Sequence, residues 1–282
     1  MATPFKEGGA IDENAALSLA TFLLEHGSHG LVVSATTGEA PTLTDEEALV
    51  LLRALRNEVG EEVLLVCGTG TNDTRHSIEL TKGAAEAGAD AALIVTPYYN
   101  KPNPAGIQAH FETIAAAIPD LPIIAYNIPS RVVVNVPPAQ LAELAKIDNV
   151  VAVKQANNDE MQPIEGMEIL AGNDDVFLKT LELGGAGGIL VASHLVGPQM
   201  REMWDAAQAG EIDRAREIDA GLRQLYAAIG ITTNPIPVKA GLAMMGLIPT
   251  DTLRLPLVPA DTEQRATMQA ALESVGLTPV TS

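Results

Sequence analysis

Residues 62–97 read EVLLVCGTGTNDTRHSIELTKGAAEAGADAALIVTP, and this stretch shows the pattern that decides the fold. Two short apolar runs, 62–68 and 91–97, flank a segment with helical periodicity that begins after Asn72-Asp73. The runs are too short for helices, are rich in β-branched residues and are apolar on both faces. Strands of a parallel sheet covered on both sides have this character. The stretch therefore predicts one β–α–β unit.

The same alternation recurs along the first two thirds of the chain. Successive runs begin about 30 residues apart, the length of one βα unit, and only the last two are closer. The predicted strands are residues 30–35, 62–68, 91–97, 122–127, 149–154, 167–172 and 187–193. Such a series favours a (β/α)8 TIM barrel of the α/β class, with a doubly wound open sheet as the alternative. The barrel is favoured because no dinucleotide-type Gly-rich turn follows the first predicted strand.

The two ends of the chain depart from this alternation. From Gly197 onward the pattern is helical, so we expect a barrel over residues 1–210 and a C-terminal helical extension, packed on it, over 211–282. Thr3-Pro4-Phe5 has the pattern of the exit from a first strand, yet only two residues precede it. We therefore expect that most of one further strand, which would precede residues 30–35 as the first strand of the barrel, is missing and that the natural gene starts upstream.

Composition and charge restrict the class of protein. Hydrophobic residues make up 47% and charged residues 19%, which is ordinary for a globular protein. The formal net charge of −19 argues against nucleic acid or an anionic membrane as a partner. A single cysteine, Cys67, allows no intrachain disulfide and fits a reducing compartment. Neither a signal peptide nor a membrane-spanning segment is predicted, so we expect a cytoplasmic protein.

The candidate catalytic groups lie where predicted strands end, because barrel active sites form at the C-terminal ends of the strands. Lys154 ends the run NVVAVK. A lysine whose ammonium is desolvated has a lowered pKa, and its neutral amine forms Schiff bases with carbonyl groups. A lysine that merely extends its charge from a strand end is the alternative. Hydroxyl groups suited to a proton relay share these positions: Thr36, Thr37, Tyr98, Tyr99 and Tyr126.

Other chemistries have little support in the sequence. The histidines show neither HxH nor HExxH spacing, so no metal site is expected. A Ser-His-Asp hydrolase would need a G-x-S-x-G turn, which is missing. Residues 68–73, GTGTND, offer only a weak anion-binding signal, and Cys67 is expected to be a buried thiol within a strand.

Several motifs, in order and at barrel spacing, resemble one known family over nearly the whole chain. The family is 4-hydroxy-tetrahydrodipicolinate (dihydrodipicolinate) synthase, within the pyruvate-dependent class I aldolases. Arg131 distinguishes the synthases from their sialate-lyase relatives, which typically lack an arginine there. The motifs are ATTGEAPTLT (35–44), VTPYYNKP (95–102), YNIPSR (126–131), VVAVK (150–154), AGNDD (171–175), NPIPVK (234–239) and DTLRLP (251–256).

The resemblance implies catalytic roles for four residues. Lys154 matches the lysine that forms the Schiff base with pyruvate. Tyr126 matches the tyrosine that relays protons beside the imine, and Thr36 the threonine that links it to a second tyrosine. Tyr99 matches that second tyrosine, which is donated across a dimer interface. The family needs neither metal nor cofactor.

The resemblance also implies substrate-binding residues and an assembly. Thr37 would hold the pyruvate carboxylate, and Arg131 the carboxylate of L-aspartate 4-semialdehyde. Gly172 and Ile189 match positions that line the pocket through their backbones. A homodimer is expected. A homotetramer is the alternative. It is less favoured, because the helical segment between Lys154 and Gly172, which contributes to the second contact in this family, is short.

The expected activity is condensation of pyruvate with aspartate semialdehyde in lysine and diaminopimelate biosynthesis. An aldolase for a 2-keto-3-deoxy sugar acid and a non-catalytic ligand-binding barrel are the alternatives. The first alternative is motivated by Val132-Val133, which replaces the usual Thr/Ser-Gly after the arginine. Ala35 likewise replaces the usual glycine before TTGE, where its Cβ would crowd the carboxylate turn.

The positions that match the family's lysine-inhibition site are altered. Asn72 and Tyr98 are retained, but His76 replaces the glutamate that binds the amino group of the effector, and Ala48 replaces a histidine. Because the acidic anchor is lost, we expect an enzyme that lysine does not inhibit.

Overall fold

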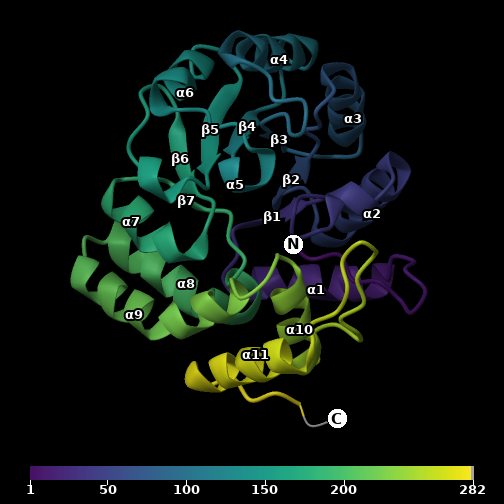
Figure 1. Ribbon diagram of the computed structural model, residues 1–282, viewed down its shortest axis with the longest axis vertical. Coiled ribbons are helices and arrows are strands. Elements are labelled where there is room, and N and C mark those ends of the chain that lie inside the picture. Colours follow the sequence, from purple (N-terminus) through teal and green to yellow (C-terminus); the bar gives the residue numbers. More distant parts are fainter. Residues whose placement is uncertain (281–282) are drawn as a thin grey trace. The chain divides into compact units, whose positions relative to one another are not determined.

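The computed structural model describes residues 1–280, which form two compact units (Figure 1). The first unit combines residues 1–63 with the C-terminal part that starts at Val191, and the second unit is Leu64–Leu190.

The second unit is a parallel sheet with helices. Each strand pairs in parallel with the next along the chain, in the order β2-β3-β4-β5-β6-β7. In Figure 1, α3, α4 and α6 lie along the outer side of these strands, and β4 is buried along its whole length. The strands are β2 (Leu64–Gly68), β3 (Ala91–Val95), β4 (Ile123–Asn127), β5 (Val150–Gln155), β6 (Glu168–Ala171) and β7 (Gly187–Gly188). The helices are α3 (Thr74–Glu86), α4 (Pro104–Ala117), α5 (Pro129–Val132), α6 (Pro138–Leu144) and α7 (Phe177–Glu182), with single 3-10 turns at Asn158–Glu160 and Asp174–Val176.

The first unit is mostly helical. Helix α2 begins with a capping box between Thr44 and Glu47, the start that the sequence predicts. Towards the C-terminus, α8 packs on α9, and both α9 and α10 pack on α11. Its elements are α1 (Glu13–Glu25), β1 (Gly30–Val33), a 3-10 turn (Ala40–Thr42), α2 (Asp45–Val59), α8 (Ser193–Gln208), α9 (Ile212–Ile229), α10 (Ile236–Met244) and α11 (Thr262–Ser274).

All seven predicted apolar runs overlap a strand. The last is much shorter than expected, because only Gly187–Gly188 pairs before the chain turns into α8 at Ser193. The predicted boundary at residue 210 lies between α8 and α9 and stays a prediction.

Residues 1–3 form no strand, yet they are buried in the first unit. The backbone N–H of Ala2 donates to Nε2 of His194 at 3.0 Å, and the Thr3 hydroxyl donates to the Gly38 carbonyl at 2.8 Å. Burial lowers the pKa of His194 to about 3, so its imidazole is neutral and Nε2 can accept. The expectation that a further barrel strand, before β1, is truncated stays a prediction.

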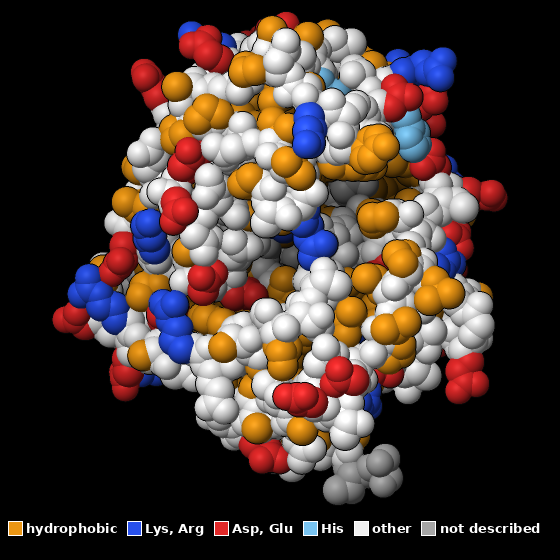
Figure 2. All heavy atoms as spheres, viewed as in Figure 1, with side chains coloured by type: hydrophobic (Ala, Val, Ile, Leu, Met, Phe, Trp, Pro, Cys, Tyr) orange, Lys and Arg blue, Asp and Glu red, His pale blue; other side chains and the backbone are white. Residues whose placement is uncertain are grey.

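The surface carries charges of both signs. On the face shown in Figure 2, acidic and basic side chains are interspersed with polar and apolar ones, without a continuous basic patch. Over residues 1–280, no helix combines the length and apolarity that crossing a bilayer requires.

Candidate active site

Lys154 and Tyr126 form the centre of the site. They lie on the neighbouring strands β5 and β4, where the parallel register pairs Tyr126 directly with Lys154. The Lys154 Nζ is 4.3 Å from the centroid of the Tyr126 ring. Both side chains are buried, with 7% and 5% of their surfaces exposed. Sheet register thus places an amine beside a phenol ring in a largely dehydrated environment.

Burial changes the protonation of this lysine. Desolvation lowers the pKa of Lys154 to about 8, the charge of Arg131 also lowers it, and the carboxylate of Asp174 opposes the shift. At pH 7 Lys154 is therefore neutral in about a tenth of the molecules, a far larger fraction than for a solvated lysine. The sequence-based expectation of a Schiff-base nucleophile thus has a physical basis in the structure.

The shifted pKa predicts how pyruvate trapping depends on pH. The rate of borohydride-trapped adduct formation should rise as Lys154 deprotonates and level off above a pH of about 8, since the pKa of the amine is about 8. The measurement is mass spectrometry of the Lys154 peptide after short reaction times. Exposed lysines in the same sample serve as the internal control. A Lys154 rate still rising at pH ~10, as for an ordinary lysine, would contradict the prediction.

Backbone hydrogen bonds position Gly172 and Ile189 at the ends of β6 and β7. Gly172 N–H donates to the Gln155 carbonyl at 2.7 Å, and Ile189 N–H donates to the Ala171 carbonyl at 2.9 Å. A Cβ on Gly172 would lie 2.7 Å from the Gln155 carbonyl oxygen and 2.8 Å from the Ala156 Cβ. Only glycine fits there, because both neighbours are held in the sheet or its immediate continuation.

An amide network, which sequence reasoning missed, joins the ends of β4 and β5. Asn127 Nδ2 donates to Gln155 Oε1 and to Asn135 Oδ1, both at 3.0 Å, and Asn127 Oδ1 accepts from Val136 N–H at 3.1 Å. Gln155 Oε1 also accepts from Asn157 N–H at 2.9 Å. The only signal of this network in the sequence was that the amide residues Asn127 and Gln155 directly follow Tyr126 and Lys154. The network fixes the strand ends that carry both groups.

The carboxylate of Asp174 lies at a predicted strand end, but the sequence assigned it no role. It follows β6 in a 3-10 turn, is buried, and acts on the Lys154 charge. Its position within the motif AGNDD was the signal that could have identified it. Over residues 1–280, no group of three or more histidine, cysteine or acidic side chains is arranged to hold a metal ion.

Arg131 is exposed and lies in the short helix α5. The helix ends at Val132 and is followed by the capping residue Val133, whose φ of 70° and ψ of −27° are unusual for any residue other than glycine. A β-branched side chain is especially unfavourable at positive φ. The family pattern has glycine at this position. Val133 therefore occupies a conformation that is suited to the glycine it replaces.

Val133→Gly should stabilise the protein by about 1 kcal/mol, because relief of the positive-φ strain exceeds the entropy cost of glycine. The measurement is the urea unfolding midpoint. Val134→Gly is the matched control, since Val134 is not among the described residues with positive φ, and it should not stabilise. Equal destabilisation by both changes would show that Val133 is unstrained.

The remaining predicted residues belong to the loop after β3 or to the first unit. Tyr99, in the loop after β3, is 88% exposed and has a φ of 69°. Thr36 and Thr37 belong to the first unit, where the Thr37 hydroxyl accepts from Asn234 Nδ2 at 2.9 Å. Ala35 has no positive φ, and its carbonyl accepts from Ala40 N–H at 3.1 Å, so the turn accommodates its Cβ.

Comparisons with known proteins agree with this geometry. A 4-hydroxy-tetrahydrodipicolinate synthase from Synechococcus elongatus is 44% identical, over 98% of this chain and 95% of its own. The structure of dihydrodipicolinate synthase from Aquifex aeolicus is 37% identical, has a TM-score of 0.95, and covers 100% of this chain and 98% of its own. The chloride-inhibited dihydrodipicolinate synthase from Acinetobacter baumannii, solved in complex with pyruvate, is 35% identical, has a TM-score of 0.94, and covers 98% of this chain and 97% of its own.

These likenesses confirm the predicted α/β TIM-barrel class. They also confirm the expected activity, that of a 4-hydroxy-tetrahydrodipicolinate synthase and thus an enzyme of the class I aldolase type. The model of the dihydrodipicolinate synthetase family matches residues 1–275, nearly the full length. With a buried lysine at the end of its fifth strand and full-length relatives above 40% identity, the chain belongs to the dihydrodipicolinate synthetase family.

Proposed function

We propose that Lys154 condenses pyruvate with L-aspartate 4-semialdehyde through a Schiff base. The observation that carries the proposal is the buried Lys154 amine, with a pKa lowered to about 8, held 4.3 Å from the ring centroid of Tyr126. The neutral amine attacks the keto carbon of pyruvate, and loss of water gives a protonated imine. That imine withdraws electrons, so the methyl group loses a proton and becomes an enamine carbon. The enamine carbon then adds to the aldehyde carbon of the second substrate, and the aldehyde oxygen takes up a proton to become a hydroxyl group.

Release of the product follows from the same bonds. The amino group of the semialdehyde portion attacks the imine carbon and displaces the Lys154 amine, which closes the ring and regenerates the enzyme. Proton transfers accompany attack, dehydration and addition. We assign them to the Tyr126 hydroxyl, with Thr36 and Tyr99 completing the relay.

The remaining assignments concern binding and assembly. Thr37 holds the pyruvate carboxylate, Arg131 holds that of the semialdehyde, and Gly172 and Ile189 line the pocket with backbone groups. Arginine suits a carboxylate because it donates two parallel hydrogen bonds. The 88% exposure of Tyr99 supports its donation to a partner subunit in a homodimer, with a homotetramer as the larger alternative. We place the enzyme in the cytoplasm.

Two measurements test the proposal. Borohydride reduction in the presence of pyruvate should add a carboxyethyl group to the Lys154 peptide, and turnover should require aspartate semialdehyde. A panel of sugar aldehydes tests the sugar-acid alternative. Absence of the adduct, or turnover with sugar aldehydes alone, would overturn the proposal.

Lysine inhibition provides a separate prediction. The wild-type enzyme should show no half-maximal inhibition below about 1 mM lysine, because His76 replaces the acidic anchor. His76→Glu should lower the half-inhibiting concentration about 10-fold or more by restoring a charge-assisted contact. Both are measured as initial rates in a lysine titration. Half-maximal inhibition of the wild type below about 1 mM lysine would contradict the prediction.

A further inference from the structure

The turn at residues 35–40 has a constrained shape. It is closed by two backbone hydrogen bonds of 3.1 Å, from Glu39 N–H to the Thr36 carbonyl and from Ala40 N–H to the Ala35 carbonyl. Glu39 adopts the left-handed conformation, with φ 57° and ψ 37°, although it is not glycine. A non-glycine residue keeps this conformation only where its surroundings impose it. The turn that carries Thr36 and Thr37 is therefore held from outside.

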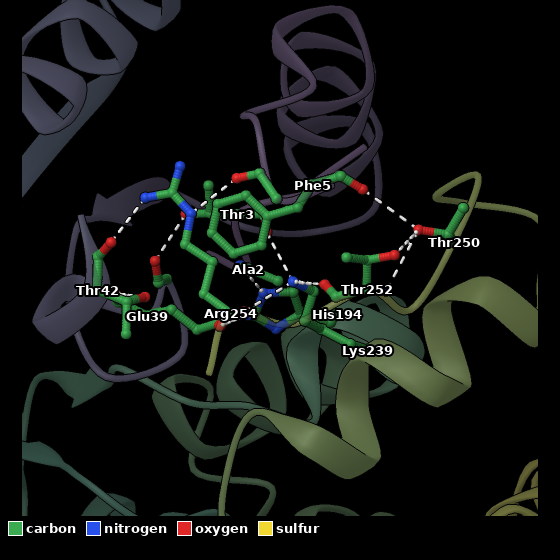
Figure 3. A network of polar contacts seen from close by, with 12 residues as sticks. Ala2, Thr3, Phe5, Glu39, Thr42, His194, Lys239, Thr250, Thr252 and Arg254 are labelled. Carbon is green, nitrogen blue, oxygen red and sulfur yellow. Dashed lines mark hydrogen bonds and ion pairs between the residues drawn. The ribbon is translucent and has the colours of Figure 1, made fainter. Parts of the chain in front are cut away.

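The external hold on this turn is a buried ion pair. Lys239 is fully buried, and its three donors are all used: Glu39 Oε1 at 2.7 Å, the Thr3 carbonyl at 2.9 Å and the Thr252 carbonyl at 2.6 Å (Figure 3). The other carboxylate oxygen of Glu39 accepts from Arg254 N–H at 3.0 Å. Such pairs add little net stability, because desolvation offsets their attraction. What this pair does provide is a single position for the Glu39 end of the turn.

A second contact holds the middle of the turn. Asn234 Nδ2 donates to the Thr37 hydroxyl oxygen at 2.9 Å. A hydroxyl that accepts this bond still carries one proton to donate. Within residues 1–280 the bond from Asn234 is the only one that this hydroxyl makes. Thr37 is partly exposed, and its hydroxyl can thus donate its proton to a bound ligand or to water.

We propose that segment 234–239 is the positioning element of the pyruvate-carboxylate site: Asn234 orients the Thr37 hydroxyl as a donor, and Lys239 holds the turn through Glu39. The proposal rests on the function given above, in which Thr37 binds that carboxylate. Asn234 is a positioning residue, because it acts through Thr37. In the observed orientation the amide presents its NH2 group to the Thr37 oxygen, and that group can only donate.

The test separates donor orientation from packing by changing one functional group at a time. Asn234→Leu keeps the side-chain shape without the donor. Asn234→Asp also keeps the shape, but its carboxylate accepts a hydrogen bond and so turns the Thr37 proton away from the substrate. The readout is the pyruvate concentration that gives half-maximal adduct formation on Lys154, which needs no aldehyde.

We expect Asn234→Leu to raise this concentration about 10-fold or more, the loss typical of a hydrogen bond to a charged group. Asn234→Asp should raise it further, and the KM for aspartate semialdehyde should change less than about twofold. In a Thr37→Val background neither change should have a further effect, because coupled residues are non-additive. Circular dichroism and the melting temperature show whether each variant is folded. If Asn234→Asp does not fold, the double-mutant cycle of Asn234→Leu and Thr37→Val tests the inference by itself.

Normal pyruvate dependence in a folded Asn234→Leu variant, or full additivity with Thr37→Val, would overturn the inference. The failure of the proposed function is distinct, because in that case the wild-type enzyme itself would form no adduct on Lys154.

Discussion

Lys154→Met is expected to abolish the pyruvate adduct and to lower kcat/KM by more than about 10³-fold, since the variant lacks the amine that forms the proposed covalent intermediate. Methionine keeps most of the side-chain volume, so the loss reports on the amine. Lys146→Met is the matched control, because Lys146 is an exposed lysine paired with Glu143 and should leave activity unchanged. An adduct on a different lysine, or wild-type turnover by Lys154→Met, would show the assignment to be wrong.

The same variant should be more stable than the wild type near pH 7. The pKa of Lys154 is about 8 in the folded protein against an ordinary 10.5, so folding opposes its charge. A shift of this size corresponds to about 3 kcal/mol at pH values below both pKa values. Between pH ~8 and ~10.5 the unfolded chain binds more protons than the folded protein, so the stability of the wild type rises with pH. The difference in stability between Lys154→Met and the wild type therefore decreases over this range. Urea unfolding at pH 7 and at pH 10 measures this difference. A less stable variant at pH 7 would contradict it.

Tyr126→Phe is expected to lower kcat by about 10²- to 10⁴-fold, the range for removal of a general acid–base group. The ring beside Lys154 is retained, so the Lys154 peptide should still acquire the pyruvate adduct, only more slowly. This contrast separates proton relay from packing. Steady-state kinetics and a time course of trapping are the measurements.

Tyr226→Phe is the control for the loss of a tyrosine hydroxyl elsewhere in the protein. Tyr226 is buried in α9 and has no part in the proposed chemistry, so its replacement should leave kcat unchanged. A Tyr126→Phe variant whose kcat stays within about twofold of wild type would show that another group relays the protons.

The positions of the strands and of the central lysine could be predicted from the sequence. Seven apolar runs at βα spacing were sufficient, because a strand covered on both faces must be apolar on both faces. Lys154 was identifiable because a charged residue that ends such a run lies at the strand end, where barrel sites form. The shortness of β7 was not predictable, since the run GGILVAS is equally apolar where it pairs and where it turns towards α8.

Two other features were decided by the tertiary structure alone. Asn127, Gln155 and Asn135 carry no periodicity, so their network becomes visible only when β4 and β5 lie side by side. Asn234 and Thr37 are 197 residues apart, and Lys239 and Glu39 are 200 apart. No local pattern encodes such pairs, because their geometry depends on how distant elements pack. The lowered pKa of Lys154 has the same origin: sequence supplies the amine, but only the surrounding atoms remove the water that would keep it charged.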